Sequence, residues 1–159
     1  MRYINKLSSK IISHFNTYRF EQGADFRWSP SRQTIFYPKL QIIEDICSLL
    51  HETAHAELRH NDYISDLELV GQEARAWEYA KVTLAPKFDI AIDDDYIADH
   101  LDTYRLWLYE RSKCPDCGQN GLQTQNTYQC LNCRCLWRAN EARLCSLRRI
   151  RLQDQKFRV

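Results

Sequence analysis

Hydrophobic residues recur with helical spacing in the first part of the chain. Between residues 3 and 18 they fall on a single helical face: Ile4, Leu7, Ile11, Ile12 and Phe15. This spacing predicts an amphipathic helix. The pattern changes over residues 24–37, where two short apolar runs flank the turn-forming residues 29–33. Such an arrangement predicts a short β-hairpin.

Helical spacing returns in three longer segments. The first runs from about residue 40 to residue 60, and the second from about residue 65 to residue 84, shortly before Pro86. The third follows the acidic residues 93–95, which favour a helix N-terminus, and extends to about residue 111. With the hairpin, these segments predict an α+β fold that is mostly helical and has one small sheet.

The C-terminal part of the chain has a different composition. Residues 114–139 are rich in cysteine, and Asn140 is placed to cap a last helix that contains Leu144, Leu147 and Ile150. We therefore expect a cysteine-rich module that is followed by a basic helical tail.

Charge is distributed unevenly along the chain. Residues 134–159 contain 8 Lys and Arg against 2 Asp and Glu, whereas residues 1–133 contain 14 against 19. We predict two domains, one over residues 1–111 and one over residues 112–159. The first residues lack the continuous apolar core of a secretion signal, and no apolar run is long enough to span a membrane. These features predict a cytoplasmic protein.

The segment His51-Glu52-Thr53-Ala54-His55 lies on the first of the longer helices. Two histidines four positions apart lie about 40° apart around a helix, so both imidazoles can bind one metal ion. The carboxylate of Glu52 lies beside them and can accept a proton from water that the metal activates. The apolar residues before His51 indicate a core helix, which argues against two ordinary surface histidines. The motif predicts a catalytic zinc site.

A catalytic zinc ion normally has three protein ligands. On a continuing helix His60 lies about 180° from His51 and faces away from the metal. Glu73 lies in an apolar stripe, where a carboxylate is costly without a cation, whereas Glu78 has basic neighbours and is expected to be solvated. We predict that Glu73 is the third ligand. The alternative is that Glu73 is buried against an arginine or a backbone donor.

Residues 49–60 resemble the H-E-x-x-H helix of the ImmA/IrrE-type zinc metallopeptidases. That family follows it with a helix of the pattern E-x-x-A-x-x-F-A-x-x-L-x-x-P. The chain has residues at matching spacings, Glu73, Ala76, Tyr79, Ala80 and Pro86, and Leu84 lies near the expected apolar position. The similarity covers about residues 20–90, and Tyr79 replaces the usual phenylalanine.

The resemblance implies the same zinc ligands, His51, His55 and Glu73, with Glu52 as the catalytic residue. It also implies a substrate that is a regulatory protein, such as a DNA-binding repressor. Zincins usually bind substrate as an added strand on a sheet edge. The candidate strand here is Thr34, Ile35, Phe36 and Tyr37, and the alternative is a hairpin that contributes only to the core.

Four cysteines form two C-x-x-C pairs that are separated by twelve residues: Cys114, Cys117, Cys130 and Cys133. Each pair places two thiolates on a tight turn, and two such turns form a closed tetrahedral zinc site. A site with four protein ligands has no open position and is expected to be structural. The spacing resembles a zinc ribbon, with strands over residues 127–129 and 136–138.

The sequence therefore predicts a zinc-dependent endopeptidase with two zinc ions per chain, whose ribbon and basic tail contact substrate or nucleic acid. One alternative is a SprT-like protease, which also joins H-E-x-x-H to a zinc ribbon and acts on DNA-bound proteins. That class takes a third histidine, usually from a His-Gly pair, and this chain has no such pair. The other alternative is a non-enzymatic binding adaptor, against which the intact Glu52 argues.

Overall fold

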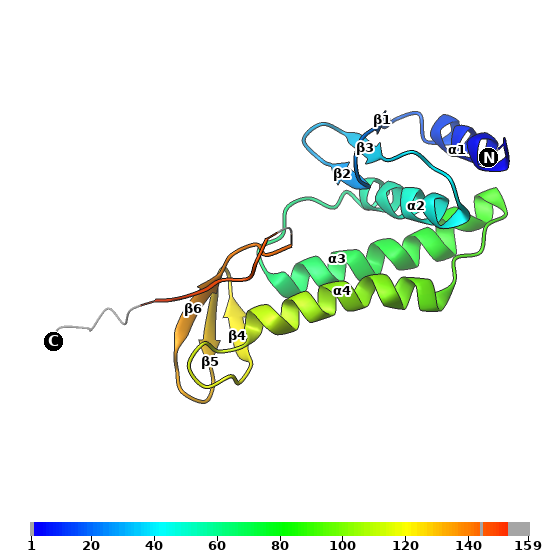
Figure 1. The fold of residues 1–159 in the computed structure, drawn as a ribbon. Coiled ribbons are helices and arrows are strands. Elements are labelled where there is room, and N and C mark those ends of the chain that lie inside the picture. The colour runs from blue at the N-terminus through cyan, green and yellow to red at the C-terminus, as the bar shows by residue number, and fades with distance from the viewer. Residues whose placement is uncertain (1, 144, 153–159) are drawn as a thin grey trace. The chain divides into compact units, whose positions relative to one another are not determined.

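A computed structural model describes residues 2–143 and 145–152 of the chain. These residues form four α-helices and two small β-sheets, so the predicted α+β class is confirmed (Figure 1). The chain divides into two compact units: Met1–Asp62 with Gln72–Ala98, and Tyr63–Gly71 with Asp99–Val159. None of the described helices is long and apolar enough to cross a membrane.

The first unit has a three-stranded sheet that packs on a helix. Its N-terminal elements are α1 (Arg2–His14), β1 (Arg19–Gln22), β2 (Arg27–Ser29), β3 (Thr34–Tyr37) and α2 (Ile43–Glu57). β3 is the central strand and pairs parallel with β1 and antiparallel with β2. α2 lies against β2 and β3 (Figure 1). The buried residues of α1 are Ile4, Leu7 and Ile11, as the helical spacing predicted.

The central position of β3 corrects the expectation that residues 34–37 form a sheet edge. Thr34, Ile35 and Phe36 are buried, Tyr37 is half-buried, and the strand has a neighbour on each side. A strand that is paired on both sides has no free backbone edge to bind a substrate strand. The sequence pattern did not reveal β1, which occupies one of these two sides.

α2 ends at Glu57, three residues earlier than the end predicted at residue 60. The Leu58 N–H donates to the Ala54 carbonyl at 2.9 Å, and Arg59 has a left-handed φ of 55°. A left-handed residue after the last turn is a common way to end a helix, although glycine usually provides it. The chain reverses at Arg59, so the prediction that His60 faces away from the motif is wrong.

The helix predicted over residues 65–84 changes its geometry before Pro86. α3 (Asp66–Tyr79) is followed by a π-helical turn (Ala80–Leu84) and a 3₁₀ turn (Ala85–Phe88). Proline lacks a backbone N–H and its ring clashes with the preceding turn, which disfavours further α-helix. α4 (Asp94–Ser112) then begins at the acidic residues, as predicted. α3 and α4 each contribute residues to both units.

The second unit contains a four-stranded antiparallel sheet. Its strands are, in order, β4 (Gly121–Thr124), β5 (Thr127–Cys130), β6 (Leu136–Ala139) and β7 (Arg149–Arg151). Tyr128 and Trp137 are buried and stack across β5 and β6 with their ring centroids 5.4 Å apart. A Cβ atom at residue 121 would collide with the Trp137 ring, so β4 can approach β5 because this residue is glycine.

The predicted helix after Asn140 is not present among the described residues 140–143 and 145–152. The Asn140 side chain accepts a hydrogen bond from the Arg148 N–H at 2.7 Å and donates to the Ser146 carbonyl at 3.0 Å. These bonds close a loop across the segment, and the chain then pairs with β6 as β7. Asparagine therefore closes a loop here and does not cap a helix. Leu144, which was assigned to that helix, lies outside the described residues.

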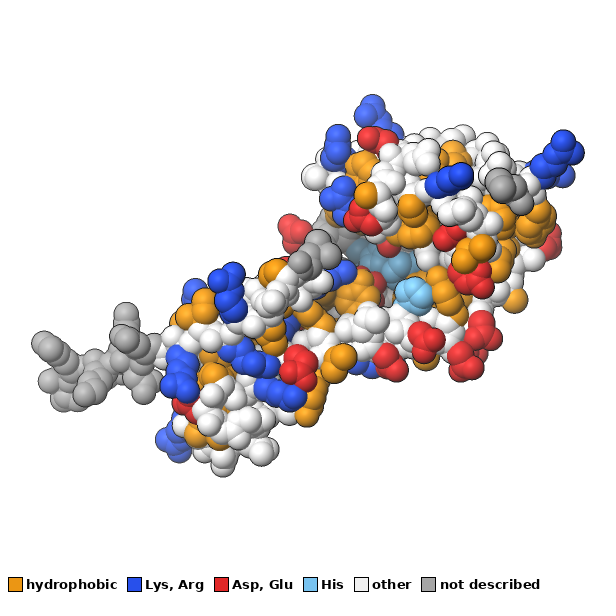
Figure 2. Space-filling view, viewed as in Figure 1, with side chains coloured by type: hydrophobic (Ala, Val, Ile, Leu, Met, Phe, Trp, Pro, Cys, Tyr) orange, Lys and Arg blue, Asp and Glu red, His pale blue; other side chains and the backbone are white. Residues whose placement is uncertain are grey.

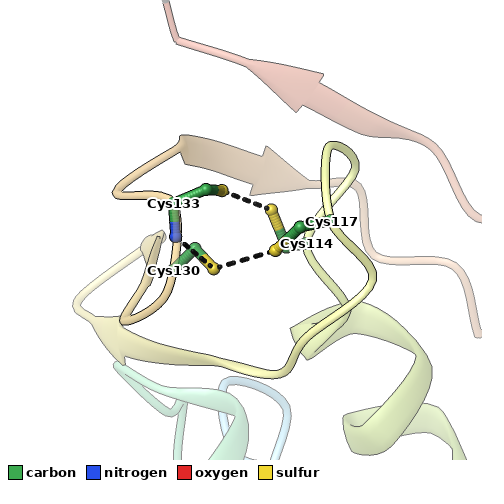
Figure 3. Close-up of side chains that lie close together, drawn as sticks. All are labelled: Cys114, Cys117, Cys130 and Cys133. Carbon is green, nitrogen blue, oxygen red and sulfur yellow. Dashed lines mark hydrogen bonds between the residues drawn. The ribbon is translucent and has the colours of Figure 1, made fainter.

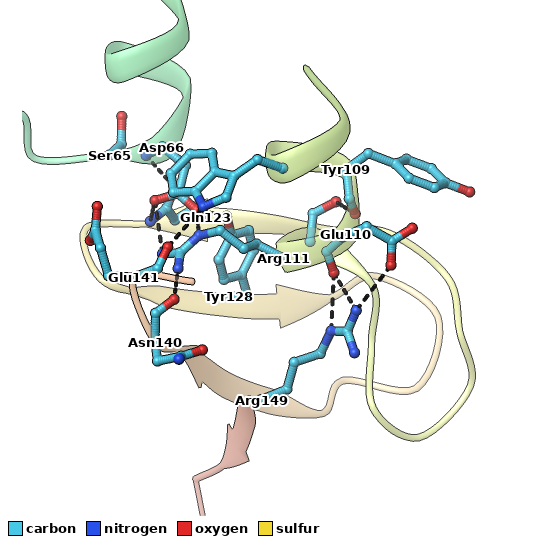
Figure 4. A network of polar contacts seen from close by, with 12 residues as sticks. Ser65, Asp66, Tyr109, Glu110, Arg111, Gln123, Tyr128, Asn140, Glu141 and Arg149 are labelled. Carbon is cyan, nitrogen blue, oxygen red and sulfur yellow. Dashed lines mark hydrogen bonds and ion pairs between the residues drawn. The ribbon is translucent and has the colours of Figure 1, made fainter. Parts of the chain in front are cut away.

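A buried carboxylate joins several elements of the second unit (Figure 4). Asp66, at the start of α3, accepts hydrogen bonds from both the Nε and Nη2 atoms of Arg111 in α4. Its carboxylate also accepts bonds from the Tyr128 hydroxyl in β5 and the Gln123 amide in β4. The Trp137 indole donates to the Arg111 carbonyl at 3.1 Å. This network connects the start of α3, the end of α4 and the sheet.

Candidate metal centres

Three predicted ligands meet in the interior of the first unit. His51 and His55 lie on one face of α2, Glu73 lies on α3, and all three are buried. The Nε2 atom of His51 is 3.1 Å from the Nε2 atom of His55 and 3.1 Å from Oε2 of Glu73. The Nε2 atom of His55 is 3.5 Å from the same carboxylate oxygen. The structure thus brings together two imidazoles and one carboxylate.

The spacing of these three atoms fits a zinc ion. Zinc bonds of 2.0–2.1 Å to nitrogen and oxygen give a tetrahedron with edges of about 3.3 Å. The three ligand atoms are separated by 3.1, 3.1 and 3.5 Å, close to that value. Two neutral imidazoles and one carboxylate would supply three of the four ligands of a tetrahedral zinc ion. The fourth coordination position would stay open. Such a set is typical of a catalytic zinc site.

The environment of Glu73 keeps its carboxylate charged. Burial by itself raises the pKa of a carboxyl group, but hydrogen bonds from His51 and His55 outweigh burial and lower the pKa of Glu73 well below its usual range. A metal ligand must be deprotonated, so this carboxylate is ready to bind a cation. The expected alternative, burial against an arginine or a backbone donor, does not describe its surroundings, because its closest charged partners are the two histidines. Glu78 is exposed.

Glu52 lies between the two histidines in the sequence and is half-buried. Its Oε2 atom accepts a hydrogen bond of 2.7 Å from the backbone N–H of Trp28 in β2. Hydrogen bonds from a backbone N–H to an ionised carboxylate are among the stronger hydrogen bonds in proteins, and they fix the orientation of the carboxylate. β2 is an edge strand of the sheet, so the edge strand and the motif are joined directly at this carboxylate.

His60 contacts the metal-binding motif from the chain that follows α2. Its Nδ1 atom is 2.9 Å from the Nδ1 atom of His55, and its N–H donates to the His55 carbonyl at 3.0 Å. Burial, together with the neighbouring His55 ring, lowers the pKa of His60 to about 4. His60 therefore lies behind a ligand and is not itself among the three converging groups.

His51 is held in a different way. Its ring stacks on the indole of Trp77 in α3, with the ring centroids 4.1 Å apart and the planes at 19°. The Nδ1 atom of His51 is the buried side-chain nitrogen that has no hydrogen-bond partner among the described residues. The orientation of His51 therefore depends on stacking, whereas that of His55 involves a hydrogen bond.

The second candidate centre lies in the second unit, where the four predicted cysteines point toward one another from two tight turns (Figure 3). The sulfur of Cys114 is 3.5 Å from that of Cys133, and the sulfur of Cys117 is 3.4 Å from that of Cys130. Zinc–sulfur bonds of 2.3 Å give a tetrahedral edge of about 3.8 Å, slightly longer than these separations. Four thiolates in this arrangement fit a closed metal site.

The first turn of this cluster favours the thiolate form of Cys117. The Gln119 N–H and the Asn132 side chain donate to the Cys117 sulfur and lower its pKa to about 6. Gly118 has a φ of 76°, as expected for a knuckle that needs a left-handed residue. The predicted strands on either side of the second pair correspond to β5 and β6.

The sequence predicted which side chains converge at the two candidate centres, but not the groups around them. Trp28 and His60 contact Glu52 and His55, and neither belongs to a recognisable spacing pattern. Trp77, which stacks on His51, lies on the same predicted helical face as Glu73. The predicted substrate strand lies in the middle of the sheet, and β2 occupies the edge that reaches the motif.

The chain matches no protein-family model, no curated protein and no solved structure.

Proposed function

We propose that this protein is a zinc-dependent endopeptidase. The observation that supports the proposal is the convergence of His51, His55 and Glu73. Glu52 follows His51 on the same helix, and its carboxylate accepts a hydrogen bond from the backbone of an edge strand. Three ligands with one open position, next to a carboxylate that can exchange protons, form the minimum set for metal-assisted hydrolysis of an amide. The similarity of residues 20–90 to ImmA/IrrE-type metallopeptidases points to the same chemistry.

In this mechanism Glu52 is the general base and later the general acid. The chemistry that zinc supplies at such a site is polarisation of the scissile carbonyl and activation of water. Glu52 takes the proton from the attacking water and delivers it to the leaving amine nitrogen. Its Oε2 atom is held by Trp28, so the other carboxylate oxygen is the one that exchanges the proton.

We assign substrate binding to β2 in place of the buried β3. β2 has one neighbour in the sheet, and its Trp28 amide reaches Glu52. A substrate in extended conformation that runs along the outer edge of β2, where the Trp28 N–H already binds Glu52, would pass beside the general base. The resemblance to ImmA/IrrE-type enzymes favours a regulatory protein, such as a repressor, as the substrate.

We further propose that the second unit binds the target, through nucleic acid or through the protein substrate. Lysine and arginine side chains lie over the part of this unit that Figure 2 shows. Arg134, Arg138 and Arg148 are exposed and form no ion pair within the described part of the chain. Unpaired guanidinium groups are the usual contacts for phosphates.

The decisive experiment replaces Glu52 by Gln in the full-length protein. The wild type is expected to cleave a proteome-derived peptide library, with cut sites read by mass spectrometry. E52Q is expected to lose cleavage while still holding two zinc ions per chain, because the amide retains the shape but cannot take the proton. Glu44→Gln, at an exposed position on the same helix, is the control and should cleave normally.

Undiminished cleavage by E52Q would contradict the mechanism. A wild type that binds two zinc ions but cuts no peptide would favour the binding adaptor, in which the site no longer performs hydrolysis. Loss of zinc from E52Q would mean that Glu52 supports the metal and not the proton transfer.

A further inference from the structure

We infer that His60 is a positioning residue for the metal ligand His55 and that it sets the affinity of the first site for zinc. This inference rests on the proposed zinc site. The two imidazoles meet through their Nδ1 atoms at 2.9 Å, with ring centroids 4.9 Å apart and planes at 72°. An edge-on contact of this kind is a hydrogen bond between rings and not a stacked pair.

With a metal ion bound to His55, the contact with His60 would require a particular tautomer of each ring. The Nε2 atom of His55 faces His51 and Glu73, so it is the atom that would bind the metal, and it needs a free lone pair. The proton of neutral His55 is then on Nδ1. This N–H donates to Nδ1 of His60, which must be unprotonated, so His60 bears its own proton on Nε2.

The backbone holds His60 in place for this role. The left-handed turn at Arg59 directs residue 60 back along α2, and the His60 N–H donates to the His55 carbonyl at 3.0 Å. The His60 carbonyl accepts a hydrogen bond of 3.0 Å from the Trp28 indole. Trp28 also binds Glu52 through its backbone, so one residue of β2 contacts the general base and the residue behind the ligand.

A partner on the second nitrogen of a histidine ligand fixes both its tautomer and its ring orientation. Removing such a partner typically weakens metal binding by about 10–100-fold. His51 has no equivalent partner among the described residues, since its Nδ1 atom is unpaired and its ring is held by Trp77. His60 is therefore the outer hydrogen-bonding group that this histidine pair has.

The test compares His60→Leu with His60→Asn in the full-length protein. The Asn carbonyl oxygen can occupy about the place of Nδ1 and accept the same hydrogen bond, whereas Leu cannot. Zinc affinity of the weaker site is measured by competition with a fluorescent chelator, with the tight four-cysteine site as an internal reference. His14→Leu, which removes an exposed imidazole from α1, is the control.

H60L is expected to bind the weaker zinc about 10–100-fold less tightly than the wild type. H60N should remain within about threefold, because it restores the acceptor. Equal affinity of H60L and the wild type would overturn the inference, and so would equal losses in H60L and H60N. A wild type that binds a single zinc ion, lost on mutation of the cysteines, would instead contradict the proposed catalytic site.

A second measurement needs no variant. In the zinc-loaded wild type, long-range ¹H–¹⁵N spectra of the imidazoles should show a proton on Nδ1 of His55 and on Nε2 of His60. A proton on Nδ1 of His60 would exclude the acceptor role, whatever the stability of the variants.

Discussion

Glu73 is a buried carboxylate whose polar neighbours are two imidazole nitrogens. The arrangement leaves several lone pairs facing one point, which is unfavourable unless a cation or a proton occupies it. The helical face was predictable from the sequence, because residues 73 and 78 are about 140° apart on a helix and cannot both face inward. The structure has Glu73 buried and Glu78 exposed, in keeping with that argument.

Replacing Glu73 by Ala is expected to remove zinc from the first site, and Glu78→Ala to leave it bound. The metal content of each purified protein gives the result: about one zinc per chain for E73A and about two for E78A, since the four-thiolate site is independent of both. If E78A loses the metal and E73A retains it, the proposed ligand set is incorrect.

Other residues at the first site could not be predicted, for a local reason. His60 was predicted on the far side of α2 on the assumption that the helix continues to residue 60. The prediction failed because α2 ends at Glu57 and Arg59 then adopts a left-handed conformation. Arginine at this position is not a recognised stop signal, unlike glycine or asparagine. The contact of Trp28 with Glu52 joins residues 24 positions apart in the sequence, which no local pattern records.

At the scale of elements, helices were predicted better than strands. The apolar faces of α1 and α2 repeat over several turns, so they stand out from the sequence. β1 and β7 are four and three residues long, mostly polar and mostly exposed. Strands of this kind form because a neighbouring strand offers hydrogen bonds. Their own sequences do not indicate that they are strands.

Asp66 joins α3, α4 and the sheet of the second unit, so its replacement tests how much this network stabilises the packing of these elements. Asp66→Asn should leave Arg111 buried without its counter-charge, because the two side chains are only 3% and 8% exposed. Breaking a buried ion pair on one side costs about 3–5 kcal/mol. Chemical denaturation should show this loss in the free energy of unfolding.

Asp102→Asn provides the matched control. Asp102 pairs with Arg105 at 2.7 Å, but both side chains are largely exposed, so the loss should be at most about 1 kcal/mol. Similar losses for the two variants would show that the network around Asp66 is not a stabilising centre.

The whole molecule combines two centres of different kinds in two units. The candidate ligands of the first centre all belong to the first unit, and the four cysteines all belong to the second. The sequence predicted both ligand sets and two domains, with a boundary after residue 111 that stays a prediction. In the structure the part of α4 from Asp99 onward belongs to the second unit, where Arg111 binds Asp66.

A chain that ends at residue 111 tests this organisation. It is expected to keep zinc in the first site and to cleave short peptides, while losing efficiency on its protein target. Its thermal unfolding should begin at a lower temperature than that of the full chain, because Arg111 and Asp66 lose the cover of Tyr128 and Trp137. Metal content, peptide cleavage and calorimetry provide the readouts. A truncated protein without zinc would show that the two units share one folding core.

The candidate ligands of the first centre come from two helices, and Glu73 is 22 positions after His51. An ion held there would act as a reversible cross-link between α2 and α3. Because the unfolded chain lacks the preformed site, each tenfold rise in free zinc above the dissociation constant would add about 1.4 kcal/mol to the stability of the folded state. The lifetime of this protein in a cell would then follow the local supply of zinc, independently of any substrate.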